Sequence, residues 1–322
     1  MKFLVIGGNA AGMSAASRVK RKSPDTEVVV LEQTHEVSYG ACGLPYYVAG
    51  LNNNLDLMRI RKADQFLANG VDLRLGCDVT GADFTAKTVS YTDENGEAHV
   101  ESYDKLLIAT GSSPKVPPIP GIRQKNIFPL KTLDQAAALK LALESNPKSV
   151  VIVGGGYIGL ELAEACILQK VPEIHIVEAL DRLLNVFDPE FSEMVKAELE
   201  KNGVHIHLGE RVMSFEGEDD KVTAVKTDKD CYAADVVILS IGVSPNTRFL
   251  PEGIEKLGNG ALVTDASMKT SVPDVYAAGD CASVWSKLLD KPMYIALGTN
   301  ANKQGRLAGD AVLGKNVRFA RA

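Results

Sequence analysis

Residues 149–159 read Ser-Val-Val-Ile-Val-Gly-Gly-Gly-Tyr-Ile-Gly. The apolar run 149–153 is typical of a strand that is buried on both faces of a parallel sheet. The turn after it is rich in glycine, and its spacing lets a backbone approach a pyrophosphate beside the N-terminus of a helix. The candidate nucleotide-binding residues of this stretch are Gly154, Gly156, Tyr157, Ile158 and Gly159.

The residues that follow complete a nucleotide-binding pattern. A helix is predicted from Leu160 to about Gln169, and a strand over 173–178. Glu178 ends this strand 19 residues after Gly159, where a carboxylate can accept hydrogen bonds from an adenosine ribose. A plain tight turn in an α/β protein is the alternative interpretation. Strand, turn, helix, strand and acid nevertheless stand in the order that a dinucleotide site requires.

The start of the chain has the same pattern, about 147 residues earlier. A strand is predicted over 3–6, a helix over 13–22 and a second strand over 27–32. That strand ends at Glu32, 20 residues after the last glycine of the turn. Because an asparagine replaces the middle glycine, this loop is predicted to hold phosphates slightly differently. The candidate residues of the turn are Gly7, Asn9, Ala10, Ala11 and Gly12.

Two further predicted strands and a linker indicate the domain organisation. One strand covers 105–109 and the other 235–242, and the proline-rich residues 114–120 are predicted to be a linker. The turns after these strands add the candidate cofactor residues Ala109, Thr110, Gly111 and Gly242. The predicted fold class is α/β, with two Rossmann-like dinucleotide-binding domains, one for FAD and one for NAD, the second inserted in the first. The predicted boundaries are 1–115 with 247–322 for the FAD domain and 116–246 for the NAD domain.

Composition excludes several classes of protein. The chain has 322 residues, of which 45% are hydrophobic, and a net charge of −6, so it lacks the basic footprint of a nucleic-acid-binding protein. No apolar run approaches the ~20 residues of a membrane span, and the N-terminus does not resemble a signal peptide. The five cysteines are scattered and odd in number, without the spacing of a zinc site. We therefore expect a cytoplasmic protein with no metal site and no membrane or nucleic-acid partner.

Two dinucleotide sites in one chain predict one flavin and one nicotinamide cofactor, because a hydride donor must meet an acceptor. Glu178 favours NADH, since its carboxylate repels the 2′-phosphate of NADPH. Arg182 lies four residues further on, so NADPH is disfavoured and not excluded.

A third candidate cofactor segment lies late in the chain. Residues 270–280 are predicted to be a strand that runs into Gly279 and Asp280. An aspartate at this point can accept a hydrogen bond from the ribityl chain of a flavin. A simple turn is the alternative interpretation of Gly279-Asp280.

Cys42 is the candidate catalytic residue. It lies on a glycine-rich turn three residues before Pro45, which is a favourable first residue of a helix. A cysteine just before a helix N-terminus is favoured as the thiolate, and a thiolate beside a flavin can attack a disulfide. An inert buried cysteine is the alternative. No second cysteine follows within thirty residues, so the redox partner of Cys42 is a small thiol or an oxygen species that gives a sulfenic acid.

Basic residues of the first helix are a candidate anion-binding face. Arg18, Arg21 and Lys22 share one side of the predicted helix by the i, i+3, i+4 rule. This side either holds a phosphate-rich thiol or is an ordinary solvated face. His205 and His207 alternate on a predicted strand and are expected to be a surface pair rather than metal ligands.

Together these segments resemble the pyridine nucleotide–disulfide oxidoreductase superfamily. More narrowly they resemble its single-cysteine branch, which includes coenzyme A disulfide reductases, NADH-dependent persulfide reductases, NADH oxidases and NADH peroxidases. The resemblance covers nearly the whole chain. It rests on residues 7–12, 42–46, 109–111, 154–159 and 279–280, and on 297–309 with Asn302-Lys303-Gln304-Gly305.

The resemblance implies an activity and a substrate site. Oxidase and peroxidase members typically carry a histidine in the first glycine loop, where this sequence has Ala10 and Ala11. Gly43-Leu44-Pro45-Tyr46 is similar to the coenzyme A disulfide and persulfide reductases. We expect nicotinamide to deliver hydride to one face of the flavin, and Cys42 to act at the other face. The residues that the resemblance places in a coenzyme A site are Ser14, Arg18, Arg21, Ser38, Asn302 and Lys303.

We therefore expect an FAD-dependent NADH oxidoreductase that reduces coenzyme A disulfide or a related persulfide through Cys42. The alternatives are an NADH oxidase or peroxidase that cycles through a Cys42 sulfenic acid, and a non-catalytic redox-sensing or electron-transfer flavoprotein. Members of the branch usually continue for a further hundred-odd residues as a dimerisation domain. The present sequence ends about where that domain would begin, which leaves oligomerisation open.

Overall fold

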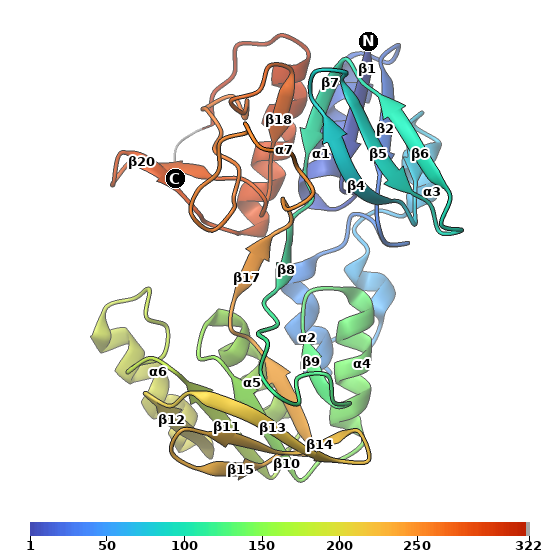
Figure 1. The fold of residues 1–322 in the computed structure, drawn as a ribbon. Helices are drawn as coiled ribbons and strands as arrows, with labels where there is room; N and C mark the ends of the chain where they lie inside the picture. The colour runs from blue at the N-terminus through green and yellow to red at the C-terminus, as the bar shows by residue number, and fades with distance from the viewer. Residues whose placement is uncertain (320–322) are drawn as a thin grey trace. The chain divides into compact units, whose positions relative to one another are not determined.

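The computed structural model describes residues 1–319 and confirms the predicted α/β fold class (Figure 1). The chain forms two compact units. The first contains Met1–Gly40, Arg59–Ser113 and the residues from Ser244 onward, and the second contains Ala41–Met58 and Pro114–Val243. The segment 41–58, which the sequence-based division placed in the first domain, thus packs with the second unit.

The first unit is built on a five-stranded parallel sheet with the strand order β18-β7-β1-β2-β3. Strand β1 lies in the centre and pairs in register with β2 and β7, so that Val5 lies between Val30 and Leu107. The strands of the sheet are β1 (Lys2–Ile6), β2 (Glu27–Leu31), β3 (Asp72–Arg74), β7 (Lys105–Ile108) and β18 (Val275–Ala277).

Both faces of this sheet are covered. Phe3 and Val5 face a core shared with the helices, and Leu4 and Ile6 face a core shared with a small antiparallel sheet. The alternation follows from the two-residue period of a strand. The helices are α1 (Ala10–Lys22), α3 (Ala63–Leu67) and α7 (Gly298–Val312), and the antiparallel strands are β4 (Asp78–Asp83), β5 (Thr88–Thr92) and β6 (Ala98–Ser102).

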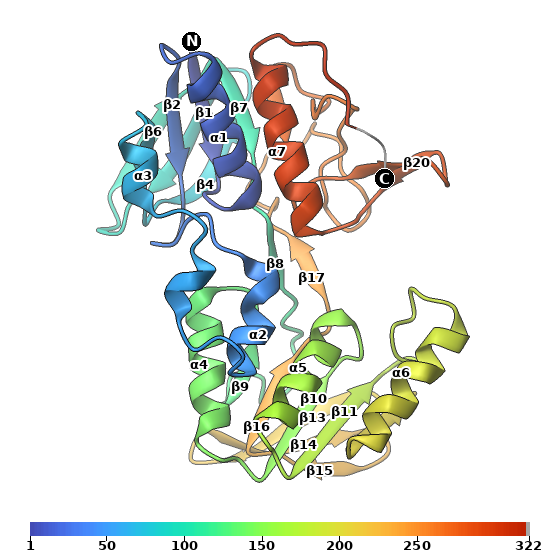
Figure 2. The ribbon, with the colours of Figure 1, turned by 180° about the vertical axis from the view of Figure 1, so that it is seen from behind.

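Helices α1 and α7 lie side by side in both views of the molecule (Figures 1 and 2). Their close approach depends on small residues, because a Cβ at Gly305 of α7 would collide with the carbonyl oxygen of Ala11. A hairpin of β19 (Val284–Ser286) and β20 (Lys291–Met293) precedes α7. The first glycine loop, at the start of α1, is thereby packed against α7.

The second unit repeats this architecture. Its five-stranded parallel sheet has the order β12-β11-β10-β16-β9. Val151 and Val153 face the three-stranded antiparallel sheet β13-β14-β15. The parallel strands are β9 (Ile127–Pro129), β10 (Ser149–Val153), β11 (Glu173–Glu178), β12 (Val204–Leu208) and β16 (Val236–Leu239). The remaining elements are β13 (Val212–Glu218), β14 (Lys221–Thr227), β15 (Cys231–Ala233), α4 (Leu133–Glu144), α5 (Tyr157–Leu168) and α6 (Pro189–Lys201).

The segment with Cys42 has little regular structure. It consists of η1 (Ala41–Gly43), α2 (Leu44–Val48) and η2 (Leu55–Met58). Helix α2 packs against α4 and α5, as Figure 2 shows. The chain crosses between the units again at β8 (Ser112–Pro114) and β17 (Val243–Pro245), which pair with each other.

The structure corrects the predicted bounds of two helices and one strand. Both helices after the glycine loops begin three residues earlier than predicted, at Ala10 and at Tyr157, because the last residues of each loop already form the first helical turn. The strand predicted within residues 270–280 is formed only over Val275–Ala277. Pro273 lacks an N–H donor for a ladder, and Asp274 has a positive φ of 65°. Within residues 1–319 no helix has the length and apolar character needed to cross a membrane.

Candidate dinucleotide and thiol sites

The two glycine loops have equivalent backbone geometry. Gly7 N–H donates to Leu31 O at 2.8 Å, and Gly154 N–H donates to Val177 O at 2.9 Å. Both glycines have a positive φ, 108° and 107°, a conformation that other residues rarely adopt. Each loop therefore leaves its first strand by the same turn.

The last glycine of each loop is required by close packing. A Cβ at Gly12 would collide with the carbonyl oxygen of Gly7, and a Cβ at Gly159 with that of Gly154. These glycines bring the start of α1 and of α5 directly over the end of β1 and of β10. The free N–H groups of each first helical turn then point out of the carboxyl edge of the sheet.

The middle position is where the loops differ. The backbone of Asn9 (φ −102°, ψ −149°) is close to that of Gly156 (φ −84°, ψ −174°). Neither is left-handed, so an asparagine is accommodated without strain. The Asn9 side chain accepts a hydrogen bond from Tyr39 N–H at 3.1 Å, whereas a Cβ at Gly156 would meet no protein atom within 4 Å.

The two acidic residues are held in the same way. Glu32 accepts from Gly8 N–H at 2.6 Å and from Thr34 N–H at 2.8 Å. Glu178 accepts from Gly155 N–H at 2.6 Å. Its other oxygen accepts from Leu180 N–H at 2.9 Å. Each carboxylate is thus oriented by two backbone donors, and its remaining lone pairs can accept from a ribose hydroxyl.

These features fit a dinucleotide at each loop. In the described part of the chain no side chain caps α1 at Asn9 or α5 at Gly156, so the first-turn N–H groups of both helices are available to an anion. Gly111 and Gly242 follow the strands that flank β1 and β10, and a Cβ at either would meet open space. The residues around both loops therefore fit a bound dinucleotide, with uncapped helix N-termini that can donate to its phosphates.

The turn after β7 is held by hydrogen bonds to Asn246, which follows the second unit in the sequence. Thr110 Oγ1 donates to Asn246 O at 2.7 Å, and Asn246 Nδ2 donates to Thr110 O at 3.0 Å. Asn246 N–H also donates to Gly111 O at 3.0 Å. Ala109 and the two residues after it are thereby held at the carboxyl edge of the first sheet.

Asp280 lies at the same edge, after β18. Its Oδ2 accepts from Ser112 Oγ at 3.1 Å. Gln304 of α7 is 1% exposed and accepts from Gly279 N–H at 2.8 Å. Gln304 was not predicted as a site residue, although its place at helical spacing between Ala301, Gly305 and Ala308 is the signal that could have found it. It fixes the turn that presents Asp280.

Cys42 is exposed, and it lies in η1 directly before α2. Pro45 occupies the first turn of that helix, as predicted, but α2 has only five residues. A Cβ at Gly43 would overlap the methyl carbon of Met58, so the turn is closed by packing within its own segment. The thiol is accessible to a small molecule.

The predicted coenzyme A residues lie mainly on α1 and α7. Ser14 Oγ donates to Asn302 Oδ1 at 2.9 Å. Arg18 forms a bidentate ion pair with Asp310, with Nη2 2.7 Å from Oδ2. This pairing lowers the pKa of Asp310 and raises that of Arg18. The structure thus brings Ser14 together with Asn302, whereas Arg18 is paired with Asp310.

The other three predicted substrate residues differ in setting. Arg21 and Lys303 are exposed on α1 and α7. Ser38 lies in the first unit with a positive φ of 50°, its N–H donating to Gly8 O at 3.0 Å. Lys22, which was expected to share the basic face, lies 3.4 Å from Asp310. The face is therefore partly neutralised by a carboxylate that the sequence pattern did not reveal.

The remaining cysteines are of two kinds. Cys77, Cys166 and Cys281 are buried, and burial raises the pKa of each thiol, that of Cys166 to about 12. Cys231 is exposed on β15. Buried neutral thiols are poor nucleophiles, which leaves Cys42 as the exposed cysteine on a predicted reactive turn.

The expected surface pair of histidines is part of a larger cluster in the second unit. His207 Nε2 and His175 Nδ1 are 3.0 Å apart, and His205 stacks on His175 at 4.9 Å. The Tyr232 ring lies 4.1 Å from that of His207. His205 is exposed, and His207 is half-buried beside the His175 and Tyr232 rings. Burial lowers the pKa of His175 and of His207.

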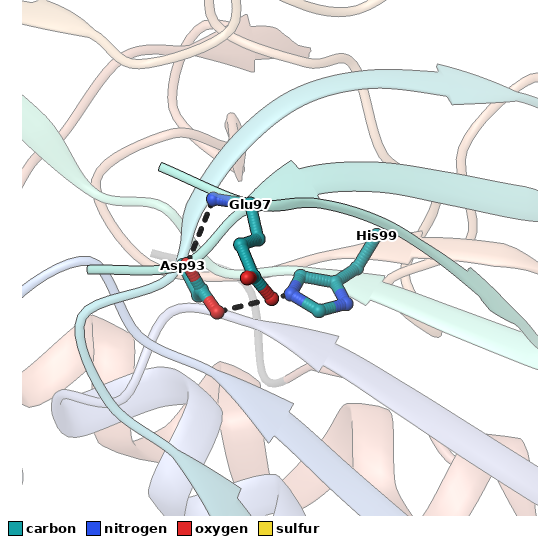
Figure 3. A group of neighbouring side chains, drawn as sticks. All are labelled: Asp93, Glu97 and His99. Carbon is teal, nitrogen blue, oxygen red and sulfur yellow. Dashed lines mark hydrogen bonds and ion pairs between the residues drawn. The ribbon is translucent and has the colours of Figure 1, made fainter. Parts of the chain in front are cut away.

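One group of metal-ligand types lies on the β5–β6 hairpin (Figure 3). Asp93, Glu97 and His99 place one ligand atom each within 4.8 Å of one another. His99 Nε2 lies 3.1 Å from Asp93 Oδ2, and the Glu97 N–H donates to Asp93 Oδ1 at 3.0 Å. These contacts lower the pKa of Asp93. They are hydrogen bonds within the hairpin turn, and they explain why the three side chains lie close together. The prediction of no metal site stays a prediction.

Comparison with known proteins gives the class of enzyme. The family model described as pyridine nucleotide-disulphide oxidoreductase matches residues 1–305. The chain is 39% identical over 318 residues to the NAD(P)H sulfur oxidoreductase (CoA-dependent) of Pyrococcus abyssi, covering 98% of this chain and 70% of that protein. It is 37% identical over 312 residues to an NADH oxidase of Enterococcus faecalis, covering 96% and 70%.

A solved structure agrees closely with the fold. The NAD-dependent persulfide reductase from A. fulgidus has a TM-score of 0.95 and 34% identity, and the match covers 100% of this chain and 61% of that one. The chain belongs to the pyridine nucleotide-disulphide oxidoreductase family. It is therefore an FAD-dependent oxidoreductase that uses a nicotinamide nucleotide, as predicted from the sequence.

Proposed function

We propose that this protein reduces coenzyme A disulfide, or a related persulfide, with NADH and through Cys42. The observation that carries the proposal is the hydrogen bond between Ser14 and Asn302, which joins two residues of the predicted substrate site on neighbouring helices. The relatives support it, because one is a CoA-dependent sulfur oxidoreductase and another a persulfide reductase.

The two cofactors are assigned to the two loops. The residues of the first unit that would hold FAD are those of the loop 7–12, Glu32, the turn 109–111 and Gly279 with Asp280. The residues of the second unit that would hold NADH are those of the loop 154–159, Glu178 and Gly242. Bound FAD supplies a two-electron carrier between nicotinamide and sulfur. We therefore propose the FAD and NAD domains as predicted from the sequence, except that residues 41–58 belong to the NAD domain.

Cys42 performs the sulfur chemistry. Its thiolate attacks one sulfur of the disulfide, forms a mixed disulfide and releases the first coenzyme A thiolate, which takes up a proton. Two electrons from NADH then cleave the mixed disulfide, which regenerates the Cys42 thiolate and releases the second coenzyme A with a proton. The balance is one NADH, one proton and one disulfide converted to NAD⁺ and two thiols.

Glu178 and Arg182 determine the proposed preference for NADH. The carboxylate is fixed by Gly155 and Leu180 N–H groups, so it cannot turn away from a 2′-phosphate without losing both bonds. The Arg182 guanidinium is exposed and donates to Asn185 O at 3.4 Å. The hydrogen bond of this guanidinium is thus to its own loop and not to the Glu178 carboxylate.

An NADH oxidase is the second candidate function, because the Enterococcus faecalis relative is nearly as similar as the sulfur reductase. In that case Cys42 would cycle through a sulfenic acid. The alanines at positions 10 and 11 provide no acid or base in the first loop, which favours the disulfide reductase. A redox-sensing or electron-transfer role is the third candidate.

Turnover with coenzyme A disulfide, oxygen and peroxide, measured side by side on the FAD-loaded protein, tests the proposal. We expect coenzyme A disulfide to be reduced at least about tenfold faster than either oxidant. Faster consumption of oxygen or peroxide would support the oxidase. No turnover with any of the three, with NADH still reducing the flavin, would support the electron-transfer role.

Variants of the exposed cations test the substrate. Arg21→Ala with Lys303→Ala should lower kcat/KM for coenzyme A disulfide about tenfold, because charge-assisted bonds to phosphate are lost, and leave a small uncharged disulfide unaffected. Lys201→Ala, an exposed cation at the end of α6, is the matched control. Arg18→Ala is unsuitable, since it would leave Asp310 without its bidentate partner. An equal effect on both disulfides would exclude coenzyme A as the ligand of this face.

A further inference from the structure

The Cys42 segment depends on the rest of the second unit for its structure. Helix α2 has five residues, and a helix this short is not stable in water by itself. Leu44 and Val48 are buried at 1% and 0% exposure, and α2 packs against α4 and α5 (Figure 2). The side chains that α4 and α5 place against α2 therefore determine where this segment is held.

Lys140 of α4 is one of these side chains. Only 9% of its side chain is exposed, and its Nζ lies 2.8 Å from Glu144 Oε1. The same ammonium lies 5.5 Å from the centroid of the Tyr47 ring. A cation over an aromatic face is attracted to it, and more strongly when water is excluded. Lysine is almost never this buried unless it is paired, so this ammonium is committed to Glu144 and Tyr47.

Gln169, at the end of α5, is the second side chain that contacts α2. Its Nε2 donates to Val48 O at 3.0 Å. Val48 belongs to the last turn of α2, where carbonyl groups have no partner within the helix. The chain then turns at Gly50, with φ 78°, and a Cβ there would lie 3.1 Å from Gln169 Nε2 and 3.6 Å from Lys140 Nζ. Both side chains therefore meet the same, C-terminal end of α2.

We propose that Lys140 and Gln169 are positioning residues for Cys42. They fix the C-terminal end of α2, and through this short helix they hold the turn with Cys42 at its other end. This inference deepens the proposed function and rests on it, because positioning matters only if Cys42 attacks a substrate. It also means that the helices after β9 and β10, in the unit assigned to NADH, carry the reactive cysteine.

Hydrogen exchange with mass spectrometry on the FAD-loaded protein tests the anchor directly. In the double variant Lys140→Met, Gln169→Ala we expect the backbone amides of 41–58 to exchange about tenfold faster, because a cation–π contact and a hydrogen bond are lost. Exchange in β10 should not change. Lys196→Met is the matched control, since Lys196 forms a similar pair with Glu200 on α6 of the same unit.

Steady-state kinetics separate positioning from a merely structural role. The double variant should lower kcat for disulfide about tenfold at an unchanged KM for NADH, and Lys140→Arg, which keeps the cation, should restore most of the loss due to Lys140→Met. An unchanged exchange rate in 41–58 would show that Lys140 and Gln169 do not hold this segment. Faster exchange with wild-type kcat would overturn the positioning role. Failure of the wild type to reduce coenzyme A disulfide would instead overturn the proposed function, and the exchange result would still decide on the anchor.

Discussion

The loops 7–12 and 154–159 show how much of a nucleotide site is fixed by backbone geometry. They share the turn at their first glycine, the packing of their last glycine and a carboxylate held by two N–H groups. They differ at Asn9 and Gly156. Only the first loop has a side chain at this point, and that side chain binds Tyr39 N–H. The first and last glycines are therefore required by contacts within the protein. The middle position makes no such contact in the second loop, and in the first loop its side chain binds a residue outside the loop.

The largest effect is expected from the last glycine of each loop. Gly12→Ala should yield protein without FAD, and Gly159→Ala should yield yellow protein that no longer oxidises NADH. In both cases the new methyl group collides with a backbone carbonyl, at a cost of roughly 1–3 kcal/mol. Flavin absorbance and NADH oxidation measure the outcome. FAD retained by Gly12→Ala and lost from Gly159→Ala would reverse the assignment of the two units.

The middle position sharpens the comparison. Gly156→Ala should leave the melting temperature unchanged, because its Cβ meets no protein atom, and should raise KM for NADH about tenfold by crowding the phosphates. Asn9→Gly should retain FAD but lose about 1 kcal/mol of stability with the bond to Tyr39. Thermal melts and KM are the measurements. A destabilised Gly156→Ala would show that the protein, and not the ligand, requires this glycine.

The acidic residues provide a third test. Glu178→Ala should narrow the preference for NADH over NADPH by about tenfold, because the charge that repels a 2′-phosphate is removed. Glu32→Ala should weaken FAD binding and leave the nucleotide preference unchanged. The ratio of kcat/KM for the two nucleotides is the measurement. Equal use of NADH and NADPH by the wild type would contradict the role assigned to Glu178.

A smaller effect, on the stability of the second unit, is expected in mild acid. The pKa values of His175 and His207 are lowered by burial. As pH falls through the ordinary imidazole pKa of ~6.5, the unfolded chain binds protons that the folded cluster does not, so stability decreases. We expect the melting temperature to be lower at pH 5.5 than at pH 7, and the decrease to be smaller in the variant His207→Phe. Thermal melts at both pH values decide, and an equal loss in the variant would assign the effect to other groups.

The sequence predicts the parallel cores well, because their strands are short apolar runs and their turns depend on particular glycines. Strand β10 and strand β11 were predicted with the bounds that the structure has. The position of 41–58 was not predictable, since nothing within α2 shows that Lys140 and Gln169 hold it. A contact between residues about a hundred positions apart leaves no local pattern.

The site residues were predictable only where local geometry requires them. Glu32 and Glu178 follow from spacing, but the pairing of Arg18 with Asp310 joins residues 292 positions apart. Gln304 was missed for the same reason, because it acts through the distant Gly279 N–H. The roles assigned to the predicted residues remain proposals that the variants above test.

The central claim is that Cys42 carries electrons from NADH to a disulfide. Rapid mixing of the FAD-loaded Cys42→Ser protein with NADH, followed by coenzyme A disulfide, tests it most directly. We expect flavin reduction at nearly the wild-type rate and disulfide turnover lowered about a thousandfold, because a nucleophile is lost while hydride transfer is kept. Wild-type disulfide reduction by Cys42→Ser would contradict the account.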